Sequence, residues 1–160
     1  MQRILVVEDE QMLAKIIGMK LEDEGFEVIH AYDGQAAYNA LSAMPQPDLT
    51  LLDVLLPHMS GFDVLEKLHA EGKSIPRVIV FSNFAQKADV ERAHALGAVD
   101  YIVKAAFSPA EILSKIKAVF AASESGVSAD GQAAYQRFSS LEEVMPMSEV
   151  LRPGESNNNP

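Results

Sequence analysis

The chain has 160 residues, of which 48% are hydrophobic, and it carries a net charge of −10. This length suits one domain with some residues to spare, and the apolar fraction is sufficient for a sizeable core. The chain has no cysteine, which excludes a disulfide framework and a cysteine-based zinc site. The negative charge, without any basic stripe, argues against a nucleic-acid partner. The apolar run at residues 4–7 is too short for a signal peptide, and no run approaches the ~18 residues of a membrane span, so we expect a cytoplasmic protein without membrane contact.

Five short apolar runs predict the strands of a parallel sheet. They occupy residues 4–7, 28–31, 49–52, 78–81 and 101–103. Each run is rich in residues that favour β-structure and is almost continuously apolar, as in strands that are buried on both faces. The second run ends without a functional side chain, which is typical of an edge strand.

Amphipathic stretches separate these runs and predict helices. In the first, Leu13, Ile16, Ile17 and Leu21 share one helical face. The stretch near residues 90–96 leads to Gly97, a residue type that often follows a helix, and the last helix has Ser108 as a candidate N-cap before Pro109. The alternation predicts an α/β fold with a doubly wound, five-stranded parallel sheet, whose sites lie at the carboxyl ends of the strands.

Polar side chains follow four of the five apolar runs. They are Glu8, Asp9 and Glu10 after the first run, Asp53 after the third, Ser82 after the fourth and Lys104 after the fifth. A single aspartate in such a place is usually a turn or cap residue. Carboxylates, a hydroxyl and an ammonium group together at one edge of a sheet instead favour a functional site.

The chemistry of this cluster favours magnesium and phosphate. Clustered carboxylates repel one another unless a cation shares them, and oxygen ligands suit Mg²⁺. The four histidines lack the spacing of a transition-metal site. Beside Mg²⁺ and Lys104, Asp53 could attack phosphorus as a nucleophile and form an acyl phosphate, while the two cations neutralise the phosphoryl oxygens.

Four sequence blocks now show a resemblance to the receiver domains of bacterial two-component response regulators. The blocks are ILVVEDE at 4–10, LLDVLLPHMSGFDVL at 51–65, VIVFSN at 78–83 and DYIVKA at 100–105. The resemblance extends from residue 2 to about residue 121, with the blocks in the family's order and spacing. It implies the flavodoxin-like receiver fold, with strand order 2-1-3-4-5, in a domain spanning residues 1–122.

The resemblance also implies a role for each residue of the cluster. The roles are the phosphoacceptor for Asp53, Mg²⁺ ligands for Glu8, Asp9, Asp53 and the backbone carbonyl of Leu55, the catalytic and switch hydroxyl for Ser82, the switch aromatic for Tyr101 and the phosphate-sensing lysine for Lys104. Pro57 and Gly61 match the family's turn after the acceptor. Tyr101 has an alternative interpretation, since an aromatic residue near the end of a last strand is often a packing residue.

Two features depart from the family's pattern. The family usually has proline after the lysine, often with a cis bond, whereas this chain has Ala105. Because a cis bond before a residue other than proline costs ~2.5–4 kcal/mol, a trans bond and a different loop shape are the alternative. The two positions that flank the phosphoryl group hold Leu55 and Phe84, and neither side chain can orient an attacking water.

The predicted function is that of a stand-alone receiver. It would take a phosphoryl group from a sensor histidine kinase or a phosphotransfer protein and signal by contact with a downstream protein, with self-catalysed phosphorylation and dephosphorylation as its only enzymatic activity. Phosphorylation could also form a homodimer through the helix near 90–96, the strand at 101–103 and the last helix. No direct binding to DNA is expected.

Three alternatives remain. A phosphorylation-independent pseudo-receiver would be an interaction module, and the complete acceptor set argues against it. An aspartyl-phosphate phosphatase of the haloacid dehalogenase type would need a second aspartate two residues after the nucleophile, where this chain has Leu55. A flavodoxin-like cofactor binder would need a phosphate loop after the first strand, where this chain has three acidic residues.

Residues 123–160 lose the alternating pattern and are rich in Ser, Gly, Asn and Glu. We expect this acidic segment to be mostly disordered, and it is too short and polar for an output domain. Ser140 and Glu143 have the spacing of a capping box, so a short helix within 135–150 is an alternative. Such a helix would bind a partner or dock on the receiver.

Overall fold

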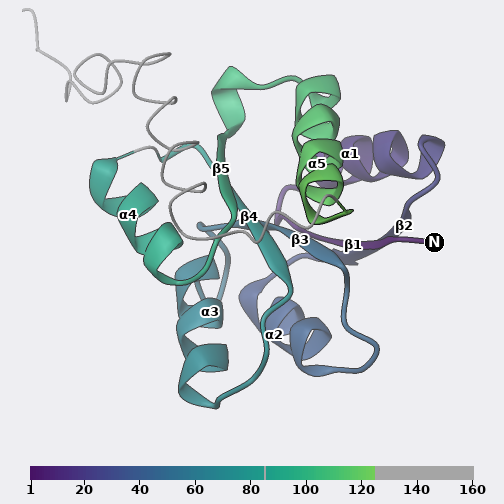
Figure 1. Ribbon diagram of the computed structural model, residues 1–160. Helices are drawn as coiled ribbons and strands as arrows, with labels where there is room; N and C mark the ends of the chain where they lie inside the picture. The colour runs from purple at the N-terminus through teal and green to yellow at the C-terminus, as the bar shows by residue number, and fades with distance from the viewer. Residues whose placement is uncertain (85, 125–160) are drawn as a thin grey trace, which may run out of the picture.

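The computed structural model describes residues 1–84 and 86–124, and in this part strands and helices alternate along the chain (Figure 1). The strands are β1 (Arg3–Val7), β2 (Glu27–Ala31), β3 (Leu49–Asp53), β4 (Arg77–Ser82) and β5 (Asp100–Val103). The helices are α1 (Gln11–Asp23), α2 (Gly34–Ser42), α3 (Gly61–Ala70), α4 (Lys87–Ala95) and α5 (Pro109–Glu124), with a short 3₁₀ turn, η1 (Lys104–Ala106), between β5 and α5.

The five strands form one parallel sheet in the order β2-β1-β3-β4-β5. This confirms the predicted fold class, the strand order and the edge position of β2. Val7 pairs with Leu52, Asp53 with Phe81, and Ser82 with Val103. The register therefore brings the carboxyl ends of four strands to one edge of the sheet.

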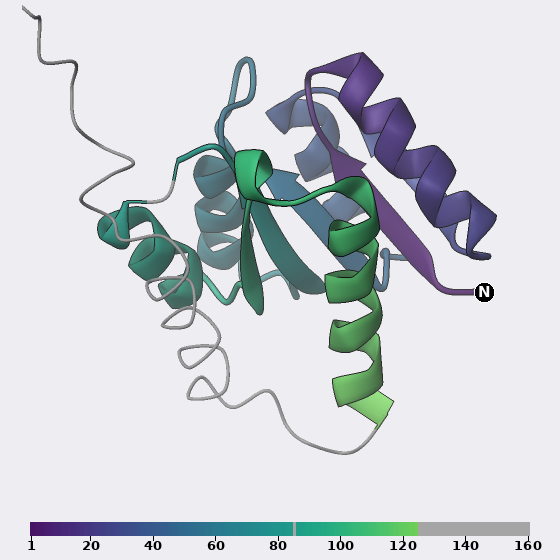
Figure 2. The same cartoon turned by 90° about the horizontal axis from the view of Figure 1, so that it is seen from above.

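Two apolar cores flank the sheet because successive side chains of a strand point to opposite faces. Ile4 and Val6 of β1 pack in the core covered by α1 and α5, and Leu5 and Val7 pack in the core covered by α2, α3 and α4. Figures 1 and 2 show α1 and α5 over one face of the sheet, with α2 and α3 on the other. No helix in the described residues is long and apolar enough to cross a membrane.

The predicted helix ends agree with the structure. The Ser108 hydroxyl accepts a hydrogen bond from the Glu111 N–H at 3.3 Å, so Ser108 caps α5. Gly97 follows α4 with φ +91°, a left-handed conformation that glycine adopts at little cost.

The prediction for the buried face of the first helix was wrong in one residue. The Ile16 side chain is 46% exposed, and Met12 and Met19 are also exposed, at 69% and 58%. The residues that α1 buries include the small residues Ala14 and Gly18. The reason is close packing: a Cβ atom on Gly18 would lie 2.7 Å from the ring of His30 on β2. Small side chains therefore occupy the part of the helix nearest the sheet, which sequence periodicity alone does not predict.

Helix α5 continues to Glu124, two residues beyond the predicted end of the domain at residue 122. The predicted disordered segment and the alternative helix within 135–150 lie outside the described residues.

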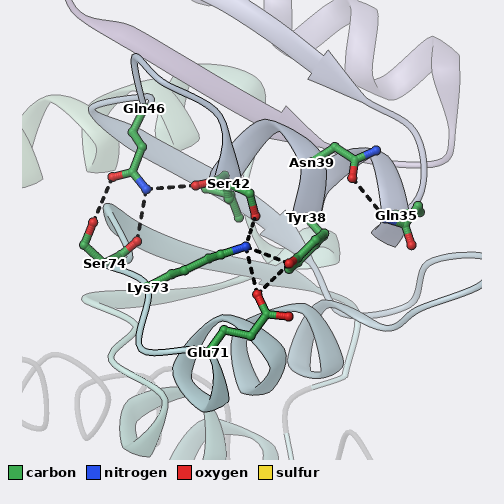
Figure 3. Close-up of polar contacts among 9 residues, drawn as sticks. Gln35, Tyr38, Asn39, Ser42, Gln46, Glu71, Lys73 and Ser74 are labelled. Carbon is green, nitrogen blue, oxygen red and sulfur yellow. Dashed lines mark hydrogen bonds and ion pairs between the residues drawn. The ribbon is translucent and has the colours of Figure 1, made fainter.

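A polar network holds α2 against the end of α3 (Figure 3). The Tyr38 hydroxyl donates to Glu71 at 2.5 Å, and the Lys73 ammonium group donates to Tyr38 at 2.7 Å and to Ser42 at 3.2 Å. Lys73 also pairs with Glu71 at 2.8 Å. These bonds join the two helices near the amino-terminal edge of the sheet, at the opposite end from the carboxylate cluster.

Candidate functional site

The three predicted carboxylates meet at the carboxyl edge of the sheet. Oxygen atoms of Glu8, Asp9 and Asp53 all lie within 4.8 Å of one another. Strands β1 and β3 are hydrogen-bonded neighbours, so the residues at their ends are brought together directly. Glu8 and Asp53 are only 1% and 3% exposed, whereas Asp9 faces solvent. Two carboxylates of the cluster are therefore buried, and the cluster is open to solvent on the side of Asp9.

Lys104 provides the positive charge of the cluster. Its ammonium nitrogen lies 2.7 Å from Oδ2 of Asp53, and it also donates a hydrogen bond to Glu8. The lysine stands at the start of the η1 turn. Within the described residues the cis peptide bond is Met44–Pro45, so the Lys104–Ala105 bond is trans. The lysine thus reaches the aspartate without the proline that the family usually has after it.

Burial dominates the electrostatics of the cluster. It raises the pKa of Asp53 and of Glu8 above the usual values, although the hydrogen bonds from Lys104 act in the opposite direction. Burial also acts to lower the pKa of Lys104, but its bonds to Asp53 and Glu8 outweigh this effect and the lysine pKa is raised. The ammonium group of Lys104 therefore favours the ionised form of both buried carboxylates, against the effect of burial.

We expect the Lys104→Met variant to raise the pKa of Asp53 further, because it removes the hydrogen bond that opposes burial. The measurement is a ¹³C NMR titration of the Asp53 carboxyl group in metal-free protein. Lys87→Met is the matched control, since it removes the lysine of an exposed ion pair with Glu91. An unchanged Asp53 titration in Lys104→Met would contradict the role of the lysine.

The same shifts determine how stability depends on pH. A carboxyl group whose pKa is raised in the folded state stabilises the fold below its unfolded pKa, and this stabilisation is lost as the pH rises through the folded pKa. A rise in pH through the pKa values of Asp53 and Glu8 therefore weakens the metal-free fold. Groups whose pKa is shifted in this way are concentrated at functional sites.

Leu55 lies in the loop between β3 and α3, directly after the aspartate. Its N–H donates to Oδ1 of Asp53 at 3.1 Å, and its side chain is 57% exposed. This bond fixes the orientation of the Asp53 carboxylate from the loop side, while Lys104 holds the other oxygen. The loop is therefore part of the site through its backbone.

Ser82 and Tyr101 are both fully buried. The Phe84 N–H donates to the Ser82 hydroxyl at 3.1 Å, and the Tyr101 hydroxyl donates to the carbonyl oxygen of Phe84. Burial raises the pKa of Tyr101 to about 12, so this hydroxyl remains a hydrogen-bond donor at physiological pH. Ser82 and Tyr101 thus hold the loop that leads from β4 towards α4.

Comparison with known families accords with this geometry. The family model described as the response regulator receiver domain matches residues 4–117. The chain belongs to the response regulator receiver family. The matched part of the receiver includes the carboxylate cluster, Ser82, Tyr101 and Lys104.

Relatives and solved structures support the assignment. The receiver is 41% identical over 120 residues to the phosphate regulon transcriptional regulatory protein PhoB of Escherichia coli, an alignment that covers 74% of this chain and 51% of PhoB. The chain thus spans about half the length of the curated relatives it matches. A CheY-like receiver domain protein from Methanospirillum hungatei is 29% identical with a TM-score of 0.69, covering 79% of this chain and 98% of that one.

A third similar protein was solved with ligands. The response regulator TrrA from Thermotoga maritima, in complex with Mg²⁺ and BeF, is 29% identical with a TM-score of 0.62, and the alignment covers 73% of this chain and 97% of that one. The described part of the receiver offers a group of acidic residues that could hold a metal ion, Glu8, Asp9 and Asp53.

The sequence analysis missed two contacts of the site. It did not predict that Lys104 bonds Glu8 as well as Asp53, or that Tyr101 binds the backbone of Phe84. The first could have been inferred from three strand ends that converge on one edge. The second has no sequence signal, because a backbone carbonyl accepts a bond from any hydroxyl that the fold brings near.

Proposed function

We propose that this receiver accepts a phosphoryl group on Asp53 from a sensor histidine kinase or a phosphotransfer protein in the cytoplasm, and that it signals by contact with other proteins. One observation carries the proposal: the Asp53 carboxylate is buried beside a lysine at 2.7 Å and beside two further carboxylates. Lys104 links Asp53 to Glu8, and the cluster is open to solvent at Asp9. This arrangement suits a nucleophile that an anionic phosphoryl donor must reach from solvent.

The proposed reaction is a simple transfer. A carboxylate oxygen of Asp53 attacks the phosphorus of the donor, and a new oxygen–phosphorus bond forms. The bond between phosphorus and the donor's nitrogen or oxygen breaks, and the leaving group departs with the electron pair and takes a proton. Lys104 lies close enough to neutralise charge on the phosphoryl oxygens, which lowers the barrier.

Mg²⁺ is the metal that the donor set fits. Glu8, Asp9, Asp53 and the Leu55 carbonyl offer only oxygen ligands, and Asp9 is exposed on the open side. Mg²⁺ typically takes one or two carboxylates and keeps several waters. When bound, the ion would supply positive charge that shields the carboxylates from the incoming phosphate. The complex of TrrA with Mg²⁺ and BeF supports this assignment by analogy.

We expect Mg²⁺ to stabilise the receiver, and the Asp9→Ala variant to lose that effect. At 100 times the dissociation constant, binding to the folded state alone contributes about 2.7 kcal/mol to the free energy of unfolding. Urea unfolding with Mg²⁺ and with EDTA measures the difference. Glu10→Ala is the matched control, since Glu10 is the adjacent acid and its side chain makes no capping bond. Equal stabilisation of Asp9→Ala and wild type would refute the site.

The proposed switch is the chain of contacts from Ser82 through Phe84 to Tyr101. A phosphoryl group on Asp53 would offer an acceptor to the Ser82 hydroxyl, which now accepts a bond from Phe84. A move of Ser82 would alter the Phe84 loop, whose carbonyl Tyr101 holds. The face formed by α4, β5 and α5 would change as a result, and this face is where we place contact with a downstream protein or a second phosphorylated copy. We regard the change as a shift between two sampled states.

Beryllofluoride, which mimics an aspartyl phosphate, is expected to shift backbone amide signals mainly between Ser82 and Ser108. The expected cause is the change in the contacts that hold the Phe84 loop. Two-dimensional NMR spectra with and without beryllofluoride and Mg²⁺ provide the measurement. Asp53→Asn, treated in the same way, is the control and should show none of these shifts. Shifts confined to α1 and α2 would argue against the proposed switch.

A further inference from the structure

The loop between β3 and α3 is pressed between two helix starts. On one side, a Cβ atom on Gly61 would lie 2.2 Å from the carbonyl oxygen of Asp53. On the other side, a Cβ atom on Gly34 would lie 1.9 Å from the carbonyl oxygen of Met59. Ordinary contacts of a Cβ atom begin at 3.4 Å, so both approaches exclude any side chain. The enclosed loop includes Leu55.

Gly34 contacts the loop with its backbone in two ways. Its N–H donates a hydrogen bond to the carbonyl oxygen of Pro57 at 3.4 Å, and Met59 is so near that a Cβ atom on Gly34 would lie 2.7 Å from the Met59 Cβ atom. Gly34 is buried at the first position of α2, after the cap residue Asp33. Glycine weakens a helix relative to alanine, so helix formation does not explain its presence here. The space that it leaves is filled by the loop.

Helix α2 cannot move away to admit a side chain at Gly34. Its buried residues Ala37 and Leu41 are fully enclosed in the core, and Tyr38 and Ser42 are bonded to the segment that follows α3 (Figure 3). Asp33 fixes the first turn, since its side chain accepts a bond from the Ala36 N–H at 2.7 Å.

The loop is also held on its far side. The Gly61 N–H donates to the Val54 carbonyl at 2.9 Å, and Ser60 forms a capping box with Asp63. His58 already has φ +69°, a strained conformation for a residue with a side chain. Because both ends of the loop are fixed, a displacement of Met59 should also displace Leu55, whose N–H donates a hydrogen bond to Asp53.

We propose that Gly34 is a positioning residue of the site. By leaving room for the Met59 carbonyl, it sets where the loop 54–60 lies, and thereby the place of the Leu55 N–H and carbonyl relative to Asp53. The expected effect of Gly34 on Mg²⁺ affinity rests on the proposed function, whereas its effect on the position of the loop does not. A loop shift on the order of 1 Å is half of a Mg²⁺–oxygen distance of about 2.0–2.1 Å, which octahedral Mg²⁺ does not tolerate.

The test is the Gly34→Ala variant, first in EDTA and then with Mg²⁺. In EDTA, the amide signals of residues 54–61 should shift and the Leu55 amide should exchange with solvent about tenfold faster, because its bond to Asp53 is displaced. With Mg²⁺, the affinity should fall by about 10- to 100-fold, the range typical of residues that orient metal ligands. Gly18→Ala is the matched control, since its Cβ would meet the side chains of His30 and Val28, on the other face of the sheet.

Asp33→Ala provides a second variant in case Gly34→Ala does not fold. It adds no bulk but releases the capped turn that carries Gly34, so the Leu55 amide should again exchange faster. Unchanged signals of residues 54–61 in the variants that fold would overturn the inference. So would equal changes in Gly18→Ala, which would indicate a general loss of stability. A wild-type receiver that binds no Mg²⁺ would contradict the proposed function alone, because the loop signals in EDTA decide the role of Gly34.

Discussion

Asp53→Asn should abolish acyl phosphate formation, reducing phosphorylation by about 100-fold or more, because the amide cannot act as the nucleophile. Glu8 and Asp9 should not replace it, because both carboxylates are expected to hold Mg²⁺. The measurement is intact-protein mass spectrometry after incubation with acetyl phosphate and Mg²⁺.

The same variant should remain folded, which distinguishes loss of the acceptor from loss of the structure. Burial raises the pKa of Asp53, so its ionised form opposes folding at neutral pH, and a neutral side chain should raise the melting temperature of metal-free protein. Asp23→Asn is the control, because Asp23 lies exposed at the end of α1. Undiminished label in Asp53→Asn would rule out Asp53 as the acceptor.

The double variant Leu55→Asn with Phe84→Glu should lose its phosphoryl group about 10- to 100-fold faster than wild type, which corresponds to ~1.4–2.7 kcal/mol of activation free energy. Hydrolysis needs a water in line with the phosphorus–oxygen bond. Both wild-type side chains are apolar and partly exposed, at 57% for Leu55 and 45% for Phe84. They offer such a water no hydrogen bond, whereas the polar replacements could orient it. The measurement is the decay of the phosphorylated protein by mass spectrometry.

The lifetime of the phosphorylated protein determines how fast the receiver can respond. A long-lived phospho-Asp53 would suit slow control rather than a rapid response. Ala105→Pro is the control for a competing cause, a lysine placed poorly by its unusual loop. Because Lys104 already lies 2.7 Å from Asp53 with a trans bond to Ala105, the proline variant should leave the decay rate nearly unchanged. If the phosphorylated double variant decays no faster than wild type, the apolar side chains of Leu55 and Phe84 are not the cause of slow hydrolysis.

Much of the fold could be predicted from local patterns. Near-continuous apolar runs predicted all five strands, because strands buried on both faces need apolar side chains at every position. Ser108 and Gly97 marked helix ends through chemistry that acts within a few residues. Ile16 shows the limit, because periodicity assigns a face to a helix but not the depth at which each residue packs.

The sequence by itself determined which residues form the site, since it places acids, a hydroxyl and a lysine after strands whose ends share one edge. Only the tertiary structure decided how they are connected. Lys104 bonds both Glu8 and Asp53, Tyr101 holds the backbone of Phe84, and Gly34 makes room for the carbonyl of Met59. Two of these three contacts end on backbone atoms, which every residue carries. The residue types that supply these backbone atoms therefore do not reveal the contacts, which exist only because the sheet and its helices bring distant segments within bonding distance.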